Sequence, residues 1–176
     1  MSNKKQPISI FNPFLIISTL FWVGKFKYFP GTLGSIVPAA EFYFYLDILQ
    51  LKNLSSYYVH LIIIIPILTF AVYLYVKNLD DKDPSEVVAD EYVGQYIAQL
   101  FSFSILSLFF DDINILYLII VSFIWFRIFD IVKPSLVGYC DKKLKGVLSI
   151  MLDDVVAGIF SALVTIFLFS IYYVIS

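Results

Sequence analysis

Long apolar runs separated by short polar loops dominate the chain. Four runs have about 20 residues each, enough for a helix to cross the ~30 Å hydrocarbon core of a bilayer. They are residues 57–76, 92–110, 113–131 and 155–175. Only Asp111 and Asp112 separate the second run from the third, so these two runs are expected to form an antiparallel hairpin.

Two further apolar runs are weaker. Residues 35–49 form a shorter run that carries Glu41 and Asp47, and we count it as a fifth crossing. Residues 8–23 are interrupted near their start by an Asn-Pro pair, so this segment is expected to lie in the membrane interface or to pack against the bundle. The predicted fold class is all-α: a polytopic membrane helix bundle with about five spanning helices and an interfacial or packed N-terminal helix.

Composition supports a membrane protein. The chain is 60% hydrophobic, with a mean hydropathy of +0.87, whereas average soluble domains are about 45–50% apolar. Its 176 residues suit a flexible tail, residues 1–7, followed by one membrane-embedded domain, residues 8–176. A net charge of −2 argues against nucleic acid as a partner. The single cysteine, Cys140, excludes an internal disulfide and a multi-cysteine zinc site.

The lysines of the short loops predict the orientation, because positive charge favours the cytoplasmic side. Lysines occur in the N-terminal tail and in three loops. These loops are residues 24–33, 77–82 and 133–145. Five crossings then place these loops in the cytoplasm and the C-terminus outside. The glycines, prolines and clustered carboxylates share the cytoplasmic face, where a soluble metal ion can reach them.

Carboxylates beside the apolar runs are the main candidate chemistry. A charged side chain costs about 2.5–3.5 kcal/mol at the centre of a span, so acids kept there need a partner. The candidate metal ligands are Asp90, Glu91, Asp130, Asp153 and Asp154. Mg²⁺ typically takes one or two carboxylates together with substrate phosphate. The pattern predicts a metal site at a membrane face that acts on a phosphorylated molecule.

The other acids in the apolar runs and turns are not expected to belong to the metal site. We expect Glu41, Asp47, Asp111 and Asp112 to be ordinary polar positions. His60 is the only histidine and is interpreted as an interfacial residue. A histidine-based nucleophile beside the clustered acids is therefore excluded.

A glycine-rich segment, Phe-Pro-Gly-Thr-Leu-Gly-Ser, occupies residues 29–35 ahead of an apolar run. Glycines permit close backbone approach. Amides at a helix N-terminus, together with the hydroxyls of Thr32 and Ser35, suit a phosphate group. The alternative is a plain turn in which Ser35 caps the helix.

The segment that starts at Asp83 predicts a helix start. Asp83 is a suitable N-cap, a proline follows it, and Glu86 comes three residues after the cap, so both acids are expected to be structural. Asp90 comes two turns later and shares a helix face with Gly94 and Ala98. Such a face packs closely against a neighbour, and a carboxylate on it needs a cation.

The end of the 113–131 run holds a second polar motif. Arg127 and Asp130 are spaced to pair on one face, either as a structural ion pair or with Asp130 on the metal and Arg127 on a phosphate. Lys133 is a second candidate phosphate contact, and Pro134 is expected to end the helix.

Asp153 and Asp154 stand at the predicted start of the last span. Acids favour helix N-termini, so one alternative is that they cap this helix. The small residues Ala157 and Gly158 follow them, which favours an interpretation in which at least one acid points into the bundle.

In order and spacing, the four motifs resemble the phosphatidylglycerophosphatase A family, over most of the chain. The resemblance implies a magnesium-dependent phosphatase of the bacterial inner membrane that converts phosphatidylglycerophosphate to phosphatidylglycerol. The acids that match are Asp90, Glu91, Asp130, Asp153 and Asp154, and the phosphate-side residues that match are Thr32, Ser35, Arg127 and Lys133.

The residues also suggest a mechanism. A bound Mg²⁺ would activate water and polarise the phosphoryl group, with Asp90, Asp130 and Asp153 as the catalytic candidates. An aspartyl-phosphate intermediate on Asp90 or Asp153 is the alternative route. A small ion or metabolite transporter with an acidic cation site is the alternative function. The oligomeric state is left open.

Overall fold

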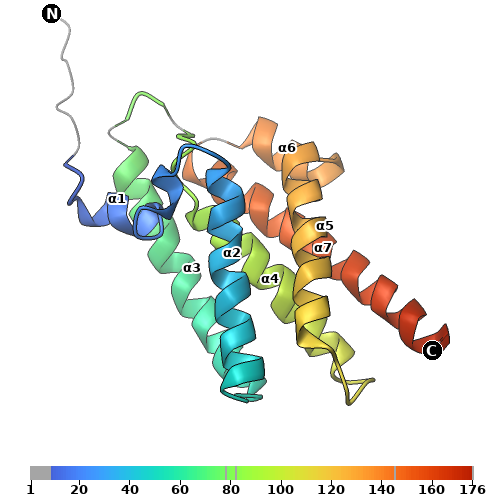
Figure 1. The fold of residues 1–176 in the computed structure, drawn as a ribbon. Coiled ribbons are helices and arrows are strands. Elements are labelled where there is room, and N and C mark those ends of the chain that lie inside the picture. Colours follow the sequence, from blue (N-terminus) through green and yellow to red (C-terminus); the bar gives the residue numbers. More distant parts are fainter. Residues whose placement is uncertain (1–8, 78, 82, 145, 176) are drawn as a thin grey trace, which may run out of the picture.

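The computed structural model describes residues 9–77, 79–81, 83–144 and 146–175, so the expected flexible tail, residues 1–7, lies outside them. The described residues form helices and no strand, which confirms the all-α prediction. In chain order the elements are α1 (Pro13–Ser18), η1 (Val23–Lys25), α2 (Pro30–Tyr43), η2 (Phe44–Ile48), α3 (Leu54–Val76), α4 (Ala89–Leu106), α5 (Ile115–Val132), α6 (Ser135–Lys143) and α7 (Val147–Ile175) (Figure 1).

Three helices in the described part of the chain are long and apolar enough to cross a membrane: α3, α5 and α7. They coincide with three of the predicted runs. However, α7 begins at Val147, six residues before Asp153, where the span was predicted to start. Apolar residues extend the helix back to Gly146, whose φ of 64° marks the preceding turn. Asp153 and Asp154 therefore lie inside α7, and the alternative in which they cap it is wrong.

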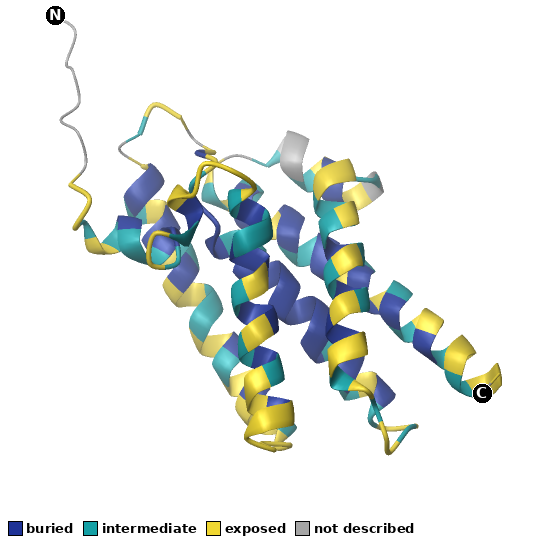
Figure 2. Ribbon diagram, viewed as in Figure 1, coloured by how far each residue is buried: buried dark blue, intermediate teal, exposed yellow. Residues whose placement is uncertain are grey.

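The helix at the centre of the bundle is α4, which contacts α2, α3, α5 and α7. Its residues are buried almost throughout (Figure 2). Because protein rather than lipid surrounds it, α4 tolerates polar side chains: Gln99 donates from Nε2 to the carbonyl of Pro38 at 2.7 Å. This explains why α4, although predicted as a span over residues 92–110, is less apolar than α3, α5 and α7.

The two weaker apolar runs are both helical in part. The six residues of α1 extend only about 9 Å, too short for a crossing. This helix packs against α3, in agreement with the expected packed N-terminal helix. The run 35–49 is helical through α2 and the five-residue π-helix η2. Its crossing of the membrane, and so the total of five spans, stays a prediction.

The start of α4 differs from the predicted one. The helix begins at Ala89, not near Asp83, so Asp83 does not cap it. Residues 84–87 form a separate turn, and the backbone N–H of Val88 donates to Ser18 O at 3.0 Å. A Cβ on Gly34 would lie 2.7 Å from Cβ of Val88. Contacts with the N-terminal segment and α2 thus override the local capping signal.

Two glycines bring α4 and α7 into backbone contact. A Cβ on Gly158 would lie 2.3 Å from the carbonyl oxygen of Gly94, and a Cβ on Gly94 would lie 2.6 Å from the carbonyl oxygen of Asp154. Small residues allow such close crossings in membrane bundles. The contact confirms that the Gly94 face of α4 packs closely, and it sets the first turn of α4 beside Asp154.

Candidate active site

One cavity of about 350 Å³ collects most of the predicted site residues. It lies where the N-termini of α2 and α4 meet the C-terminus of α5 and the early turns of α7, at the end of the bundle that also carries α6 (Figure 1). Eight of the nine candidates line it: Thr32, Asp90, Glu91, Arg127, Asp130, Lys133, Asp153 and Asp154. The ninth, Ser35, is buried beside Arg127.

Three of the acids form the tightest group in this cavity. Asp90, Glu91 and Asp154 each offer a carboxylate oxygen, and these oxygens lie within 4.8 Å of one another. Unit charges about 4 Å apart repel by roughly 4 kcal/mol at the effective dielectric constant near a protein surface. Three ionised carboxylates at this separation therefore need a cation between them.

The polar atoms of this acid trio (Asp90, Glu91 and Asp154) fit such a cation. One oxygen of each side chain is buried without a hydrogen-bond partner in the described part of the chain: Oδ1 of Asp90, Oε2 of Glu91 and Oδ2 of Asp154. Buried polar atoms are normally paired, so three unpaired oxygens in one place fit a cation as their common partner. Oxygen-only donors favour a hard divalent ion.

Arg127 sits beside the trio and is held by two partners. Its Nη1 lies 2.8 Å from Oδ2 of Asp130 and donates to Oγ of Ser35 at 3.2 Å. Ser35 in turn donates to the carbonyl of Gly31 at 2.8 Å. The predicted pairing of Arg127 with Asp130 is confirmed, and it orients the guanidinium at the cavity wall. Asp130 and Asp154 line the same cavity.

Lys133 and Asp153 form a second ion pair at the cavity, with Nζ of Lys133 2.7 Å from Oδ2 of Asp153. α5 ends at Val132, directly before Lys133 and Pro134, as expected. Lys133 takes the left-handed conformation, with φ of 48°. This turn carries its side chain back across the cavity to α7, so Asp153 faces a lysine while Asp154 belongs to the acid trio.

The glycine-rich segment forms the first turns of α2, which begins at Pro30. Ser35 therefore lies inside the helix, and the alternative in which it caps α2 is wrong. A Cβ on Gly31 would lie 2.1 Å from Oε1 of Glu91, so the lack of a side chain at this turn leaves room for the carboxylate of Glu91 in its present position. Thr32 lines the cavity.

Sequence reasoning missed Asp83 and Ser85 as cavity residues. Both line the cavity together with Pro84, on the turn that precedes α4. Their local pattern matched the start of a helix, so the sequence favoured a structural role for them over a place in the cavity. Their position seven and five residues before Asp90 was the available signal, but only the turn at residues 84–87 directs them to the cavity.

Comparison with known proteins gives a consistent result. The chain matches the family Phosphatidylglycerophosphatase A over residues 16–169. It is 33% identical over 168 residues to phosphatidylglycerophosphatase A of Haemophilus influenzae, covering 93% of both chains. It is 30% identical over 158 residues to phosphatidylglycerophosphatase A of Escherichia coli, covering 90% of this chain and 84% of that one.

A third relative carries a different name. The chain is 32% identical over 153 residues to a putative phosphatidylinositol-3-phosphatase of Bacteroides thetaiotaomicron, covering 84% of this chain and 87% of that one. No solved structure shows significant similarity. The family match spans all four motifs and the whole lining of the acidic cavity. The chain is a phosphatase and belongs to the phosphatidylglycerophosphatase A family.

Proposed function

We propose that this chain is a Mg²⁺-dependent phosphatase of the bacterial inner membrane, with its acidic cavity facing the cytoplasm. Its substrate is phosphatidylglycerophosphate, and its products are phosphatidylglycerol and inorganic phosphate. The observation that carries the proposal is the convergence of Asp90, Glu91 and Asp154 beside two cationic side chains in one cavity. The transporter alternative is not retained, because the family is one of phosphatases.

The acid trio (Asp90, Glu91 and Asp154) is the proposed holder of the metal. When bound, Mg²⁺ supplies Lewis acidity, which polarises the phosphoryl oxygens and favours hydroxide over water. The orphaned oxygens of the trio are the donors expected to reach it. The site lies near one end of the helices, so a lipid headgroup can reach it while the acyl chains remain in the bilayer.

The remaining charged residues act on the phosphate and the water. Arg127 and Lys133 stabilise the negative charge that develops on the phosphoryl oxygens. Asp130 and Asp153 hold these cations in place and are the carboxylates available to accept the proton of the attacking water. The water oxygen bonds to phosphorus, the bond from phosphorus to the glycerol oxygen breaks, and a proton passes to that oxygen.

The test begins with phosphate release from phosphatidylglycerophosphate by purified protein. EDTA should abolish release and Mg²⁺ should restore it. Asp90→Asn should lower release at least about 100-fold, since even the loss of residues that only support metal ligands costs 10–100-fold. Asp111→Asn, in the loop between α4 and α5 at the other end of the bundle, is the matched control and should keep wild-type turnover.

A second readout separates metal binding from folding. Mg²⁺ binds the folded state, so it should raise the melting temperature of the wild type and of Asp111→Asn but not that of Asp90→Asn. Equal Mg²⁺ stabilisation of all three proteins would contradict the assignment of Asp90 to the metal. Normal turnover in Asp90→Asn would contradict the proposed site.

The name of the Bacteroides relative makes phosphatidylinositol 3-phosphate the second substrate to assay. Both lipids present a phosphomonoester on a polyol headgroup, so the same cavity chemistry applies to each. Preferential release from the inositol lipid would replace the proposed substrate and leave the proposed metal site intact.

A further inference from the structure

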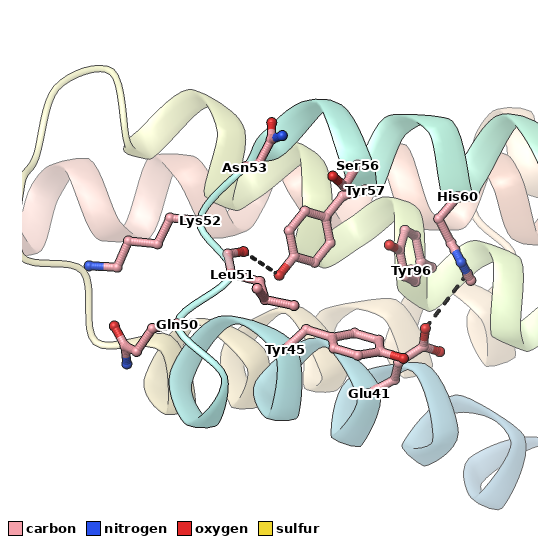
Figure 3. A pocket seen from close by; sticks show the side chains of 10 residues that line it. All are labelled: Glu41, Tyr45, Gln50, Leu51, Lys52, Asn53, Ser56, Tyr57, His60 and Tyr96. Carbon is pink, nitrogen blue, oxygen red and sulfur yellow. Dashed lines mark hydrogen bonds and ion pairs between the residues drawn. The ribbon is translucent and has the colours of Figure 1, made fainter.

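A second cavity, of about 520 Å³, lies away from the acidic site. Figure 3 shows the residues that line it. It is lined by η2, by the loop of residues 50–53, by the first turns of α3 and by α4, towards the end of α2 and α3 that lies opposite the acidic site (Figure 1). Its volume falls in the usual range for ligand pockets. The two cavities share no lining residue among those described, so the phosphatase site does not account for it.

Glu41 closes the inner end of this cavity. One of its oxygens accepts a hydrogen bond from the hydroxyl of Tyr92, and the other lies 3.7 Å from Nε2 of His60. His60 Nε2 is also 2.9 Å from the Tyr92 hydroxyl. Glu41 and His60 are thus members of one polar cluster, not the isolated polar and interfacial positions that the sequence suggested.

Glu41 lies far along α2 from the acidic site and still reaches a cavity. Glu41 follows the start of α2 by eleven residues, roughly 16 Å along the helix axis. Its side chain is 23% exposed, and that exposure faces the cavity. With run 35–49 as the predicted fifth span, Glu41 is an intramembrane carboxylate, which is by default a candidate functional group whose charge selects a cation.

The cavity walls also favour a cation. Tyr45, Tyr57 and Tyr96 line it, and the ring of His60 lies 4.9 Å from that of Tyr96 (Figure 3). Aromatic faces attract ammonium groups, and phenol oxygens accept their N–H bonds. An aromatic wall with one carboxylate at its end is therefore a site for a small organic ammonium.

The outer end of the cavity carries the opposite charge. Figure 3 shows Lys52 and Gln50 at the end away from Glu41. Lys52 forms no ion pair within the described part of the chain. The cavity thus presents an anion inside and a cation at its mouth. A zwitterion with an inner ammonium and an outer phosphate matches this order, whereas an anionic glycerol headgroup does not.

We propose that this cavity binds the headgroup of a zwitterionic phospholipid with a primary ammonium group. The ammonium lies against Glu41 and the tyrosine rings, and the phosphodiester lies beside Lys52 and Asn53. The site is separate from the hydrolysed substrate and does not depend on the metal.

The experiment is native mass spectrometry of the purified full chain, titrated separately with phosphatidylethanolamine, phosphatidylcholine and phosphatidylglycerol of identical acyl chains. Wild type should bind the ethanolamine lipid roughly tenfold more tightly than the other two. Phosphatidylglycerol has no ammonium charge for Glu41 to attract, and the choline group has no N–H to donate to Glu41 or to the phenol oxygens. Glu41→Gln should remove this preference. Asp47→Asn, an exposed acid of η2 outside this cavity, is the matched control and should keep it.

A second variant tests the proposal if Glu41→Gln does not fold. Lys52→Gln, at the exposed mouth, should weaken ethanolamine-lipid binding several-fold while the melting temperature stays unchanged. Equal binding of the three lipids by wild type would overturn the proposal. So would choline-lipid binding as tight as ethanolamine-lipid binding, or a preference that survives in both Glu41→Gln and Lys52→Gln.

Discussion

The contact between Gly94 and Gly158 offers the sharpest test of how the fold positions the acidic site. Gly158→Ala would place a methyl carbon 2.3 Å from the Gly94 carbonyl oxygen, whereas ordinary contact begins at 3.4 Å. The partner atom is backbone and cannot rotate away, so the two helices must separate locally by roughly 1 Å in a close-packed interior. Overpacking of this kind costs about 1–3 kcal/mol of stability.

The catalytic effect should exceed the effect on stability. Separation of α4 from α7 moves Asp154 away from Asp90 and Glu91, because these acids lie on opposite sides of the contact. A displacement of about 1 Å in an active site can lower turnover about 100-fold. We therefore expect Gly158→Ala to fold in detergent yet lose most phosphate release and most Mg²⁺ stabilisation.

The matched control is Ala162→Gly, one turn further along the same buried face of α7. It destabilises the helix by about 1 kcal/mol without introducing a clash. Melting curves with and without Mg²⁺, together with turnover numbers, would be measured for both variants. If Gly158→Ala keeps wild-type turnover, or if Ala162→Gly loses as much, the close helix crossing does not set the site geometry.

Two further predictions concern the cations of the cavity. Arg127→Lys removes the guanidinium whose Nη1 contacts both Ser35 and Asp130, so kcat/KM should fall about 10–100-fold with little change in Mg²⁺ stabilisation. A large loss of Mg²⁺ stabilisation would contradict a phosphate-side role. Lys133→Gly relieves a left-handed backbone conformation but removes the partner of Asp153. Turnover should therefore fall about tenfold or more, while the free energy of unfolding changes by less than about 1 kcal/mol; retained turnover would exclude Lys133 from the reaction.

Several features could be predicted because they depend on local pattern. Apolar runs identified α3, α5 and α7, since about 20 apolar residues suffice for a spanning helix. The spacing of Asp90, Gly94 and Ala98 identified the closely packed face of α4, since helical periodicity alone places them together. The candidate acids were recognisable because carboxylates are costly beside apolar spans.

Other features depended on contacts between distant segments. α4 begins at Ala89 because the backbone N–H of Val88 donates a hydrogen bond to the carbonyl of Ser18. Local capping rules do not include a contact between such distant segments. Glu41 and His60 appeared unrelated along the chain, yet α2 and α3 bring them to 3.7 Å. Side-chain pairing between helices is set by how the helices cross, and a single sequence does not specify that geometry.

The amino-acid sequence by itself determined a helical membrane protein, its family and the candidate acids that line one cavity. Only the tertiary structure divided those acids by surroundings, grouping Asp154 with Asp90 and Glu91 while pairing Asp153 with Lys133. The physical reason is that adjacent residues of a helix point about 100° apart. Which of two neighbouring aspartates meets the opposing carboxylates therefore depends on the rotation and spacing of α7 against α4, set by the contact between Gly158 and Gly94.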